Sequence, residues 1–264
     1  MPKILITGCS SGFGLAIAKT FLSREWEVLA TMRTPRNDLL PPCDRLEILA
    51  LDVTNVESIA KAVDAAGPID ALVNNAGVGM LNVLEGAELS KVRELFETNV
   101  FGAMAITKAV LPRMRERQSG VIVNVSSSVT IKPLPALAVY SASKAALNAF
   151  TESLALEAAL FGVRAKLVLP GSAPTTDFGK NAVARMGMNI PEPYAAFVQD
   201  YLMKLRSGTE FTTPEEVAHA VWRAVTEPDS PMKIPAGADA RTLFARQSTP
   251  STDTSTCSST GNLK

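Results

Sequence analysis

Strand-like and helix-like segments alternate along most of this 264-residue chain. Short runs rich in β-branched residues are separated by segments with the apolar spacing of helices. Strands are predicted at residues 3–7, 27–32, 46–51, 71–74, 120–125, 164–169 and 232–235, and helices at 12–23, 55–66, 89–117, 140–161 and 214–226. Because such alternation requires crossover connections, we expect an α/β fold built on a single doubly wound parallel sheet with helices on both faces.

Two of the predicted helices begin with a capping pattern. Thr213 is expected as an N-cap residue, with Glu216 completing a capping box three residues later. Thr54 and Glu57 have the same spacing, which predicts a second capping box. These patterns fix where the two helices should begin.

The composition fits one large globular domain. With 47% hydrophobic and 20% charged residues, a chain of this length can bury a sizeable core. From Gln247 onward the sequence is rich in Ser and Thr, so we expect one domain over residues 1–246 and a disordered tail over residues 247–264. The 26 basic and 26 acidic residues balance, which argues against nucleic acid or an anionic membrane as a partner.

The sequence favours a reducing compartment and no membrane span. No apolar stretch approaches the length of a membrane span, and the first residues run straight into a strand without a secretory leader. The three cysteines, Cys9, Cys43 and Cys257, are odd in number and far apart, which suggests free thiols and not a disulfide framework. We therefore expect a cytoplasmic protein.

A glycine-rich turn follows the first predicted strand. Gly8, Gly12 and Gly14 lie between that strand and the first helix. Glycines let a backbone approach a pyrophosphate closely, and a helix N-terminus offers free N–H groups and a positive dipole end. A glycine cluster can also mark an ordinary turn, but its position directly behind an N-terminal strand favours a nucleotide-binding loop.

Tyr140 and Lys144 are four residues apart in a predicted helix, and Ser127 lies thirteen residues before Tyr140. Residues four apart share a helix face, so the phenol and the ammonium should lie side by side. A neighbouring cation favours the phenolate, which should lower the pKa of Tyr140 and suit it to acid–base chemistry. The alternative is an ordinary amphipathic pair on a surface helix, and the nucleotide-binding loop favours the catalytic interpretation.

The single histidine, His219, limits the possible chemistry. No serine lies in a Gly-x-Ser-x-Gly turn to pair with His219, so the sequence argues against a serine hydrolase relay. Clusters of His and Cys with zinc-ligand spacing are absent from the sequence as well. We predict no metal site, and a structural or solvent-facing role for His219.

Four motifs follow one another along the chain. They are the loop at residues 7–14, the tetrad Asn74-Asn75-Ala76-Gly77, Asn99, and the set of Ser127, Tyr140 and Lys144. In combination they resemble the short-chain dehydrogenase/reductase family, in its short single-domain branch, from residue 3 to about residue 237. The resemblance implies a Rossmann-like fold and an oxidoreductase that moves a hydride between a nicotinamide cofactor and a carbonyl or secondary alcohol, as a ketoreductase does.

The family pattern implies cofactor contacts in the glycine loop, around the adenine, behind the fourth strand and beside the nicotinamide. These contacts would be made by Gly8, Ser10, Ser11, Gly12, Phe13, Gly14, Arg33, Asp52, Val53, Asn74, Asn75, Ala76, Gly77, Tyr140, Lys144, Pro170, Gly171 and Thr175. Asp52 would contact the exocyclic amine of the adenine. The tetrad at residues 74–77 could also be simply a strand end and turn.

The resemblance also implies a catalytic set of Ser127, Tyr140, Lys144 and Asn99. Tyr140 would exchange a proton with the substrate oxygen, and Ser127 would hydrogen-bond that oxygen. Lys144 would also hold the ribose of the nicotinamide. Asn99 would kink a helix and hold a water through its backbone, although a polar residue can bend a helix without any catalytic purpose. Spacing selects Ser127 over its two serine neighbours, which can satisfy nearby backbone groups.

The end of the second predicted strand bears on the choice of cofactor. An acidic residue there would bind the ribose 2′-hydroxyl of NAD, whereas an arginine would pair with the 2′-phosphate of NADP. This chain has Arg33 at that place, with Arg36 close behind and no carboxylate before Asp38. Against this, Ser11 stands where many NADP-dependent relatives carry a basic residue. We predict NADP(H) as the cofactor, with NAD(H) as the alternative.

Residues 176–213 form the predicted substrate lid. The lid carries flexible and aromatic side chains that suit an apolar pocket and suit the underside of two short helices equally well. They are Phe178, Met186, Met188, Ile190, Tyr194, Phe197, Tyr201, Leu202 and Met203. The expected substrate is a hydrophobic ketone or secondary alcohol, of the kind that hydroxysteroid- or retinol-type relatives use.

Two other functions share part of this pattern. Sugar-nucleotide epimerases and dehydratases have the Tyr-x3-Lys pair, but usually with a different glycine spacing and a longer C-terminal substrate domain. Non-enzymatic cofactor-binding sensors or scaffolds typically lose the tyrosine or the lysine, and both are present here.

The expected assembly is a homodimer or homotetramer. In many relatives the helices that correspond to residues 89–117 and 140–161 form the subunit contact. Small residues in the second helix would allow close packing there, or equally against the sheet. These are Ala142, Ala145, Ala146 and Ala149.

Overall fold

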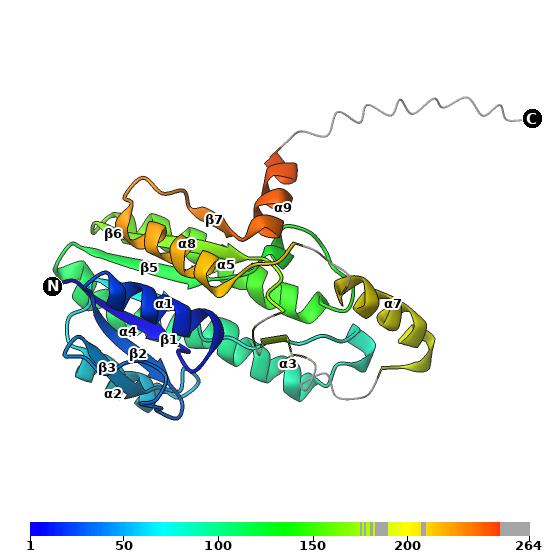
Figure 1. Ribbon diagram of the computed structural model, residues 1–264, viewed down its shortest axis with the longest axis horizontal. Coiled ribbons are helices and arrows are strands. Elements are labelled where there is room, and N and C mark those ends of the chain that lie inside the picture. The colour runs from blue at the N-terminus through cyan, green and yellow to red at the C-terminus, as the bar shows by residue number, and fades with distance from the viewer. Residues whose placement is uncertain (175, 177, 180–181, 183–189, 207–209, 249–264) are drawn as a thin grey trace, which may run out of the picture.

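A single parallel sheet organises the part of the chain that the computed structural model describes, residues 1–174, 176, 178–179, 182, 190–206 and 210–248 (Figure 1). Its seven strands have the order β3-β2-β1-β4-β5-β6-β7. They are β1 (Lys3–Thr7), β2 (Glu27–Met32), β3 (Leu46–Ala50), β4 (Ala71–Asn74), β5 (Gly120–Val125), β6 (Val163–Pro170) and β7 (Lys233–Ala236). The predicted doubly wound parallel sheet is confirmed.

The central strands are buried over their whole length. Every residue of β4 and β5 is buried, whereas the edge strand β3 has no fully buried position. A parallel sheet covered on both faces explains why these strands appear in the sequence as continuous apolar runs. In the register of β1, Ile4 lies opposite Val28 of β2 on one side and Ala71 of β4 on the other.

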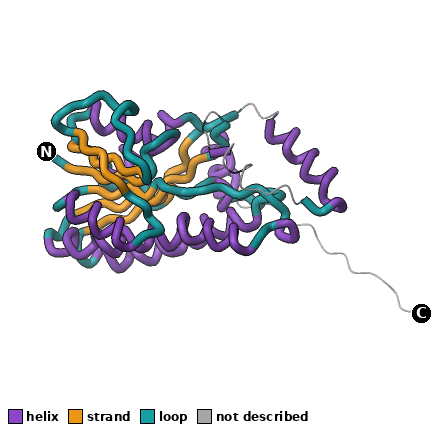
Figure 2. The backbone as a smooth tube through the Cα atoms, turned by 90° about the horizontal axis from the view of Figure 1, so that it is seen from below, coloured by secondary structure: helices purple, strands orange, loops and turns teal. Residues whose placement is uncertain are grey.

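Helices cover both faces of the sheet (Figures 1 and 2). On one face lie α1 (Gly12–Ser23) and α8 (Pro214–Thr226), which pack side by side over one apolar cluster. On the other face α2 (Val56–Ala66), α4 (Ala103–Glu116) and α5 (Ala138–Ala159) enclose a second cluster. The sheet and these two layers hold the strand ends in fixed positions.

An aromatic cluster joins α1 to α8. The ring of Phe21 lies 5.1 Å from the rings of both Trp26 and Trp222, measured between centroids. The guanidinium of Arg24 stacks 4.2 Å over Trp222 and lies 3.4 Å from the exposed His219. His219 is therefore solvent-facing, as predicted.

The helix predicted over residues 89–117 is divided in three. It consists of α3 (Leu89–Phe96), a π-helical segment η2 (Glu97–Gly102), and α4. At the end of the π-helical segment, a Cβ on Gly102 would lie 2.8 Å from a side-chain carbon of Val53. This close approach explains why glycine stands there, and π-helical turns are frequent at functional sites.

The two predicted capping boxes have different outcomes. Thr213 and Glu216 form the expected box at the start of α8. The prediction for Thr54 is wrong, because Asn55 is the N-cap of α2 and accepts a hydrogen bond from the Ser58 N–H at 2.8 Å. The hydroxyl of Thr54 instead donates to Asp52.

Several described helices were not assigned from the sequence. They are α7 (Ala195–Arg206), α9 (Ala238–Ser248) and the short helices η1 (Leu84–Gly86), η3 (Ser128–Thr130) and η4 (Glu192–Tyr194). Gln247 belongs to α9, so the predicted tail begins two residues inside a helix. Residues 249–264 lie outside the described ranges. Among the helices described, none has the length and apolar character that crossing a membrane requires.

Candidate active site

The glycine loop lies between the end of β1 and the start of α1. Gly8 and Gly12 have φ angles of 76° and 55°, a region that side chains rarely adopt. Gly14 has no space for a side chain, because a Cβ there would lie 2.2 Å from the Gly8 carbonyl oxygen. Ser11, at the N-cap of α1, makes no side-chain capping bond, so its hydroxyl does not occupy the N–H groups of the first turn. The cradle fits a pyrophosphate.

The tetrad after β4 is bonded to the glycine loop. The Thr7 hydroxyl accepts hydrogen bonds from the N–H groups of Asn75 and Ala76, at 3.0 and 2.9 Å. The Asn75 amide nitrogen donates back to the carbonyl oxygens of Thr7 and Gly8, at 2.9 and 3.1 Å. The tetrad is thus a strand end and also one wall of the loop. Sequence reasoning did not assign Thr7 this role.

A buried polar network lies beneath this edge of the sheet. The Asn74 amide donates to the side-chain oxygens of Asn124 and Thr107, at 2.8 and 3.0 Å. Asn124 in turn donates to the Thr151 hydroxyl at 2.7 Å. These bonds connect β4 and β5 to α4 and to α5, the helix that carries Tyr140 and Lys144.

Asn99 lies in the π-helical segment and is 1% exposed. Its side chain exchanges hydrogen bonds with the Val78 backbone: the Val78 N–H donates at 2.8 Å, and the Asn99 amide donates to the Val78 carbonyl at 2.9 Å. The amide also donates to the Ser143 hydroxyl at 3.2 Å. The Asn99 side chain therefore links the π-helical segment η2 to the backbone after β4 and to α5.

Tyr140 and Ser127 meet in a buried site. Tyr140 is 7% exposed, in the first turn of α5, and Ser127, also 7% exposed, follows the end of β5. Burial raises the pKa of Tyr140 well above its ordinary value, and a hydrogen bond with the Ser127 side chain only partly opposes this. Ser126, by contrast, donates to the Asn148 side chain at 2.6 Å. Of these two serines, Ser127 is thus the one bonded to the phenol.

Lys144 lies on the same face of α5 as Tyr140 and is 4% exposed. Its Nζ donates to the Val125 carbonyl at 3.0 Å and lies 5.9 Å from the centroid of the Tyr140 ring. Burial lowers the pKa of Lys144 from 10.5 to about 8. Both side chains are buried, which excludes an ordinary pair on a surface helix.

The expected direction of the Tyr140 pKa shift is wrong. Lys144 was expected to lower it, whereas burial raises it. The ammonium is directed at the Val125 carbonyl and is itself destabilised by burial, so it does little for a phenolate. Tyr140 is therefore a phenol at neutral pH.

Lys144 should make a contribution to the free energy of unfolding that rises with pH above about 8. Its pKa in the folded protein, about 8, lies below the 10.5 of an exposed lysine, so between these values the unfolded chain binds the extra proton and folding is favoured as pH rises. At about 1.4 kcal/mol per pKa unit, the full effect is about 3 kcal/mol. The difference between the wild type and Lys144→Met in urea unfolding at pH 7, 8, 9 and 10 measures it, because this difference cancels the opposite contribution of the buried Cys9 thiol above about pH 9.

A Lys144→Met variant should lack this rise and be more stable than the wild type at pH 7. Lys108→Met, at an exposed position on α4, is the matched control and should keep the wild-type pH profile. Parallel profiles for the wild type and Lys144→Met would contradict the buried ammonium.

Arg33 and Asp52 lie at the ends of β2 and β3. The pKa of the Asp52 carboxyl is lowered, mainly by a hydrogen bond from the Thr54 N–H. The positive charge of Arg33 lowers it further. Arg33 is exposed, whereas Arg36 is engaged in an ion pair with Asp38 at 2.7 Å. The two arginines are thus not equivalent as candidates for binding a phosphate.

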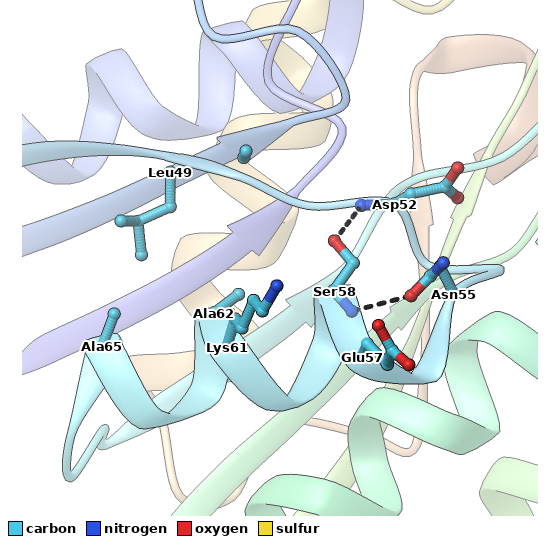
Figure 3. A pocket seen from close by; sticks show the side chains of 9 residues that line it. Leu49, Asp52, Asn55, Glu57, Ser58, Lys61, Ala62 and Ala65 are labelled. Carbon is cyan, nitrogen blue, oxygen red and sulfur yellow. Dashed lines mark hydrogen bonds between the residues drawn. The ribbon is translucent and has the colours of Figure 1, made fainter.

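A hollow of about 560 Å³ lies between α2 and the edge strand β3 (Figure 3). In Figure 3 the Ser58 hydroxyl accepts from the Asp52 N–H, and both residues line this hollow. The hollow is lined by Leu49, Ala50, Asp52, Asn55, Glu57, Ser58, Lys61, Ala62 and Ala65. Asp52 is the one predicted cofactor residue among them, so the hollow is distinct from the cluster around Tyr140.

Among the described residues of the predicted lid, Phe178 lies next to Tyr140. The Phe178 ring lies 5.7 Å from the Tyr140 ring, and a Cβ on Gly79 would lie 2.9 Å from the same phenyl ring. Pro170 and Gly171 stand at the end of β6, at the same edge of the sheet. The predicted contact Thr175 and the lid residues Met186 and Met188 lie outside the described residues.

Neither a metal-ligand cluster nor a thiol lies among the described residues around Tyr140. Within the described ranges no three His, Cys, Asp or Glu side chains are grouped to hold a metal ion. Cys9 is a buried free thiol whose pKa burial raises to about 12, and Cys43 is an exposed one. Neither cysteine is among the residues around Tyr140, and Cys257 lies outside the described residues.

Comparisons with known proteins agree with this geometry. The sequence profile of the short chain dehydrogenase family matches residues 2–186. The chain belongs to the short-chain dehydrogenase/reductase family. It is 39% identical to the uncharacterized oxidoreductase YusZ of Bacillus subtilis, over 84% of either chain. It is also 34% identical to human retinol dehydrogenase 8, over 87% of this chain and 79% of that protein.

Solved structures confirm the Rossmann-like fold of this short-chain dehydrogenase/reductase. A short-chain dehydrogenase from Streptomyces avermitilis is 34% identical with a TM-score of 0.81, over 93% of this chain and 92% of that one. One from Burkholderia cenocepacia, solved in complex with NADP, is 27% identical with a TM-score of 0.74, over 92% and 91%. This protein is accordingly an oxidoreductase with a nicotinamide-binding fold.

Two functional features of this dehydrogenase were missed by sequence reasoning. The Thr7 hydroxyl joins the glycine loop to the tetrad, and Ser143 bonds Asn99. Thr7 stands next to the glycines and Ser143 next to Lys144, so their positions were visible, but their partners are 68 and 44 residues away in the sequence. Only the folded arrangement identifies such pairs.

Proposed function

We propose that this protein is an NADP(H)-dependent dehydrogenase/reductase that interconverts a hydrophobic ketone and a secondary alcohol, with Tyr140 as the general acid and base. The observation that carries the proposal is the buried set of Ser127, Tyr140 and Lys144 at the sheet edge where the glycine loop lies. When bound, the nicotinamide cofactor supplies or accepts the hydride.

In the reductive direction Tyr140 donates its proton to the carbonyl oxygen. Tyr140 carries its proton at neutral pH and so has one to donate, but burial makes the phenol of the cofactor-free protein a weaker acid than an exposed tyrosine, so the role rests on the position of the residue beside Ser127 and not on its pKa. Ser127, which is bonded to the phenol, is placed to donate to the same substrate oxygen as negative charge develops. In the oxidative direction the two residues would act in reverse.

Lys144 and Asn99 lie next to Gly77, the last residue of the tetrad at residues 74–77. A Cβ on Gly77 would lie 3.3 Å from the Asn99 side-chain oxygen and 3.5 Å from the Lys144 Nζ. With glycine at that position, the ammonium can reach a ribose hydroxyl laid along the tetrad. Lys144 would thereby hold the cofactor, and Asn99 would hold the backbone that the cofactor contacts.

The proposal of an apolar substrate is based on residues of the predicted lid. Phe178 packs near Tyr140, and α7 presents Phe197 and Met203 with about half of each side chain exposed. The relative retinol dehydrogenase 8 is named for an apolar alcohol, which agrees with this choice. Flexible and aromatic side chains suit a pocket for such molecules.

A panel of hydrophobic ketones and alcohols, followed by NADPH absorbance, tests the function. Turnover of apolar ketones would support it, and activity restricted to small polar sugars would contradict the apolar pocket. Tight NADPH binding without turnover across the panel would favour a non-enzymatic sensor.

Replacing Arg33 by Asp should move the cofactor preference from NADP(H) towards NAD(H). An arginine pairs with the 2′-phosphate, whereas a carboxylate repels it and accepts a hydrogen bond from the 2′-hydroxyl. We expect the ratio of kcat/KM for NADPH to that for NADH to fall by about 100-fold, as two lost charge-assisted hydrogen bonds would cause. Arg36→Asp is the control, since Arg36 is already paired with Asp38. An unchanged ratio in Arg33→Asp would refute the assignment.

We further propose a homodimer or homotetramer that joins through α5. Ala142, Ala145 and Ala149 are exposed on α5, so they do not pack against the sheet of their own subunit. Leu156, further along the same helix, and Leu160, directly after its end, are each 78% exposed. An apolar helix face of this kind suits a partner helix. The free thiols of Cys9 and Cys43 support a reducing compartment, and we propose the cytoplasm.

A further inference from the structure

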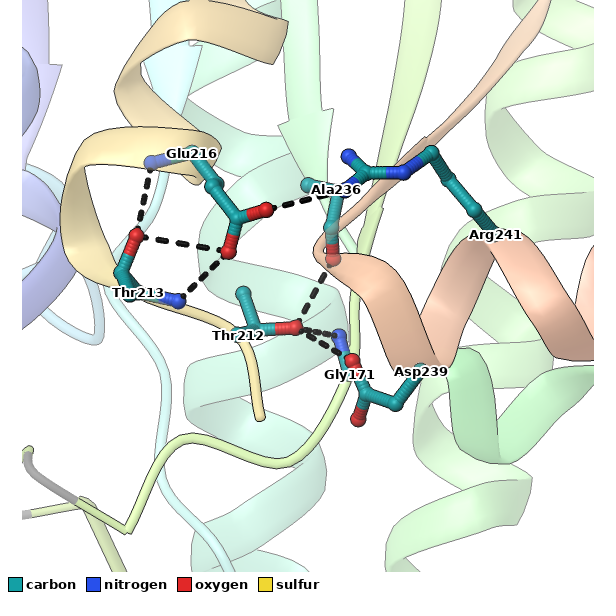
Figure 4. Close-up of polar contacts among 7 residues, drawn as sticks. All are labelled: Gly171, Thr212, Thr213, Glu216, Ala236, Asp239 and Arg241. Atoms are coloured by element: carbon teal, nitrogen blue, oxygen red, sulfur yellow. Dashed lines mark hydrogen bonds and ion pairs between the residues drawn. The ribbon is translucent and has the colours of Figure 1, made fainter. Parts of the chain in front are cut away.

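A polar cluster joins three segments behind the end of β6 (Figure 4). Gly171 and Ser172 follow β6, Thr212 precedes α8, and Asp239 lies in the first turn of α9. Thr212 is 1% exposed. No motif in the sequence indicates this cluster, because residues from its three segments are 27 to 68 positions apart.

Each polar group of the cluster has a specific partner. The Thr212 hydroxyl accepts from the Gly171 N–H at 2.9 Å, and its one proton lies between the Asp239 carboxylate at 2.8 Å and the Ala236 carbonyl at 2.9 Å. The other carboxylate oxygen of Asp239 accepts from the Ser172 N–H at 2.6 Å. The Thr212 N–H donates to the Ser172 carbonyl at 2.7 Å. Two side chains thus accept from both amides of the chain after β6, and the Gly171 N–H is shared with the Ala236 carbonyl at 3.2 Å.

The backbone is shaped for these contacts. A Cβ on Gly171 would lie 2.1 Å from the Asp239 carboxylate oxygens. A Cβ on Gly237, which has a φ of 98°, would lie 1.9 Å from the Thr212 hydroxyl. Glycine is therefore required at both places where the backbone meets the two side chains.

The cluster also connects the site to α9. This helix contacts η3, the short helix that begins directly after Ser127. Arg241 of α9 forms an ion pair with Glu216 of α8 at 3.0 Å, which attaches α9 to α8 independently of Asp239. One helix therefore lies against both the segment after β6 and the segment after the proposed catalytic serine.

We propose that Asp239 and Thr212 are positioning residues, which fix the segment at residues 171–172 so that the chain after β6 is held at the nicotinamide end of the cofactor site. The proposal rests on the proposed function, since it requires the cofactor to lie at this edge of the sheet. It goes further in assigning a role in hydride transfer to two side chains outside the catalytic set.

Hydrogen exchange of the cofactor-free protein gives a readout that does not depend on activity. Asp239→Asn keeps the size of the side chain but removes its charge, and Thr212→Val removes the hydroxyl. The Ser172 amide should exchange at least about tenfold faster in Asp239→Asn, because its charge-assisted acceptor is lost. The Gly171 amide should exchange faster in Thr212→Val, which removes one of its two acceptors. Arg241→Gln, which breaks only the ion pair to Glu216, should leave these two amides as in the wild type.

Kinetics and cofactor binding then decide whether the segment is positioned for reaction. Misplacement by about 1 Å can lower a rate by up to about 100-fold, so we expect kcat for both variants to fall at least tenfold while substrate KM stays within about threefold. The fluorescence of bound NADPH should change in these variants and not in Arg241→Gln. Thermal unfolding confirms that the variants are folded, and Thr212→Ser should restore the wild-type behaviour.

The outcomes separate the proposal from the function on which it rests. Faster exchange with wild-type kcat and wild-type NADPH fluorescence would overturn the positioning role and leave a merely structural contact. Unchanged exchange in both variants would overturn the contacts themselves. Failure of the wild type to bind or turn over NADPH or NADH would instead refute the proposed function, and the positioning role with it.

Discussion

Replacing Tyr140 by Phe should lower kcat/KM by about a thousandfold and leave the affinity for NADPH within about threefold of the wild type. The substitution removes only the hydroxyl, and general acid–base catalysis by a positioned group contributes about 100- to 10,000-fold. The ring remains, so its packing against Phe178 and the burial of the site are retained. Steady-state kinetics and NADPH fluorescence titration measure the two effects separately.

The adjacent serines provide a matched pair for this experiment. Ser127→Ala should lower kcat by about 100-fold or more, because one donor to the developing charge is lost. Ser126→Ala should leave turnover close to the wild type, since its hydroxyl is bonded to Asn148 and not to Tyr140. Turnover by Tyr140→Phe at the wild-type rate would refute the assigned mechanism.

Replacing Gly14 by Ala should abolish measurable binding of NADPH. The new Cβ would lie 2.2 Å from the Gly8 carbonyl oxygen and 2.6 Å from the Asn75 amide nitrogen, so the loop and the tetrad would have to separate. Since the loop amides and the start of α1 form the pyrophosphate cradle, this shift should weaken binding by at least about 100-fold. Fluorescence titration of NADPH measures the loss.

Gly67→Ala separates this effect from the general cost of adding a side chain. Gly67 has a φ of 64° with open space around its Cβ position, at the end of α2. The variant should lose about 1 kcal/mol of stability and bind NADPH as the wild type does. Equal affinity of Gly14→Ala and Gly67→Ala for NADPH would contradict the proposed cradle.

The strands and most helices could be predicted because their signals are local. The buried strands β4 and β5 are continuous apolar runs, and the capping box at Thr213 lies within four residues. The glycine loop and the set around Tyr140 were predicted for the same reason, since each combines residue type with short spacing. Their arrival at one sheet edge follows from the parallel topology.

The errors come from contacts between distant segments. The division of the helix at residues 89–117 depends on Gly102 packing against Val53 and on the bonds of Asn99 with Val78. Thr54 does not cap α2 because Asp52 takes its hydroxyl, and the pKa of Tyr140 rises because the fold buries it. The helix α9 has a weak apolar pattern, and Asp239 and Arg241 are among the residues that attach it to distant segments. None of these partners is indicated by sequence spacing.

The position of α7 has a consequence for how such enzymes diversify. In both views α7 stands apart from the sheet, and none of its described residues belongs to the two apolar layers that enclose the strands (Figures 1 and 2). Apart from the buried Val198, described positions of α7 can therefore change without disturbing the two apolar layers or the nucleotide cradle. A gene duplicate could acquire a new substrate through this helix while inheriting its redox chemistry intact.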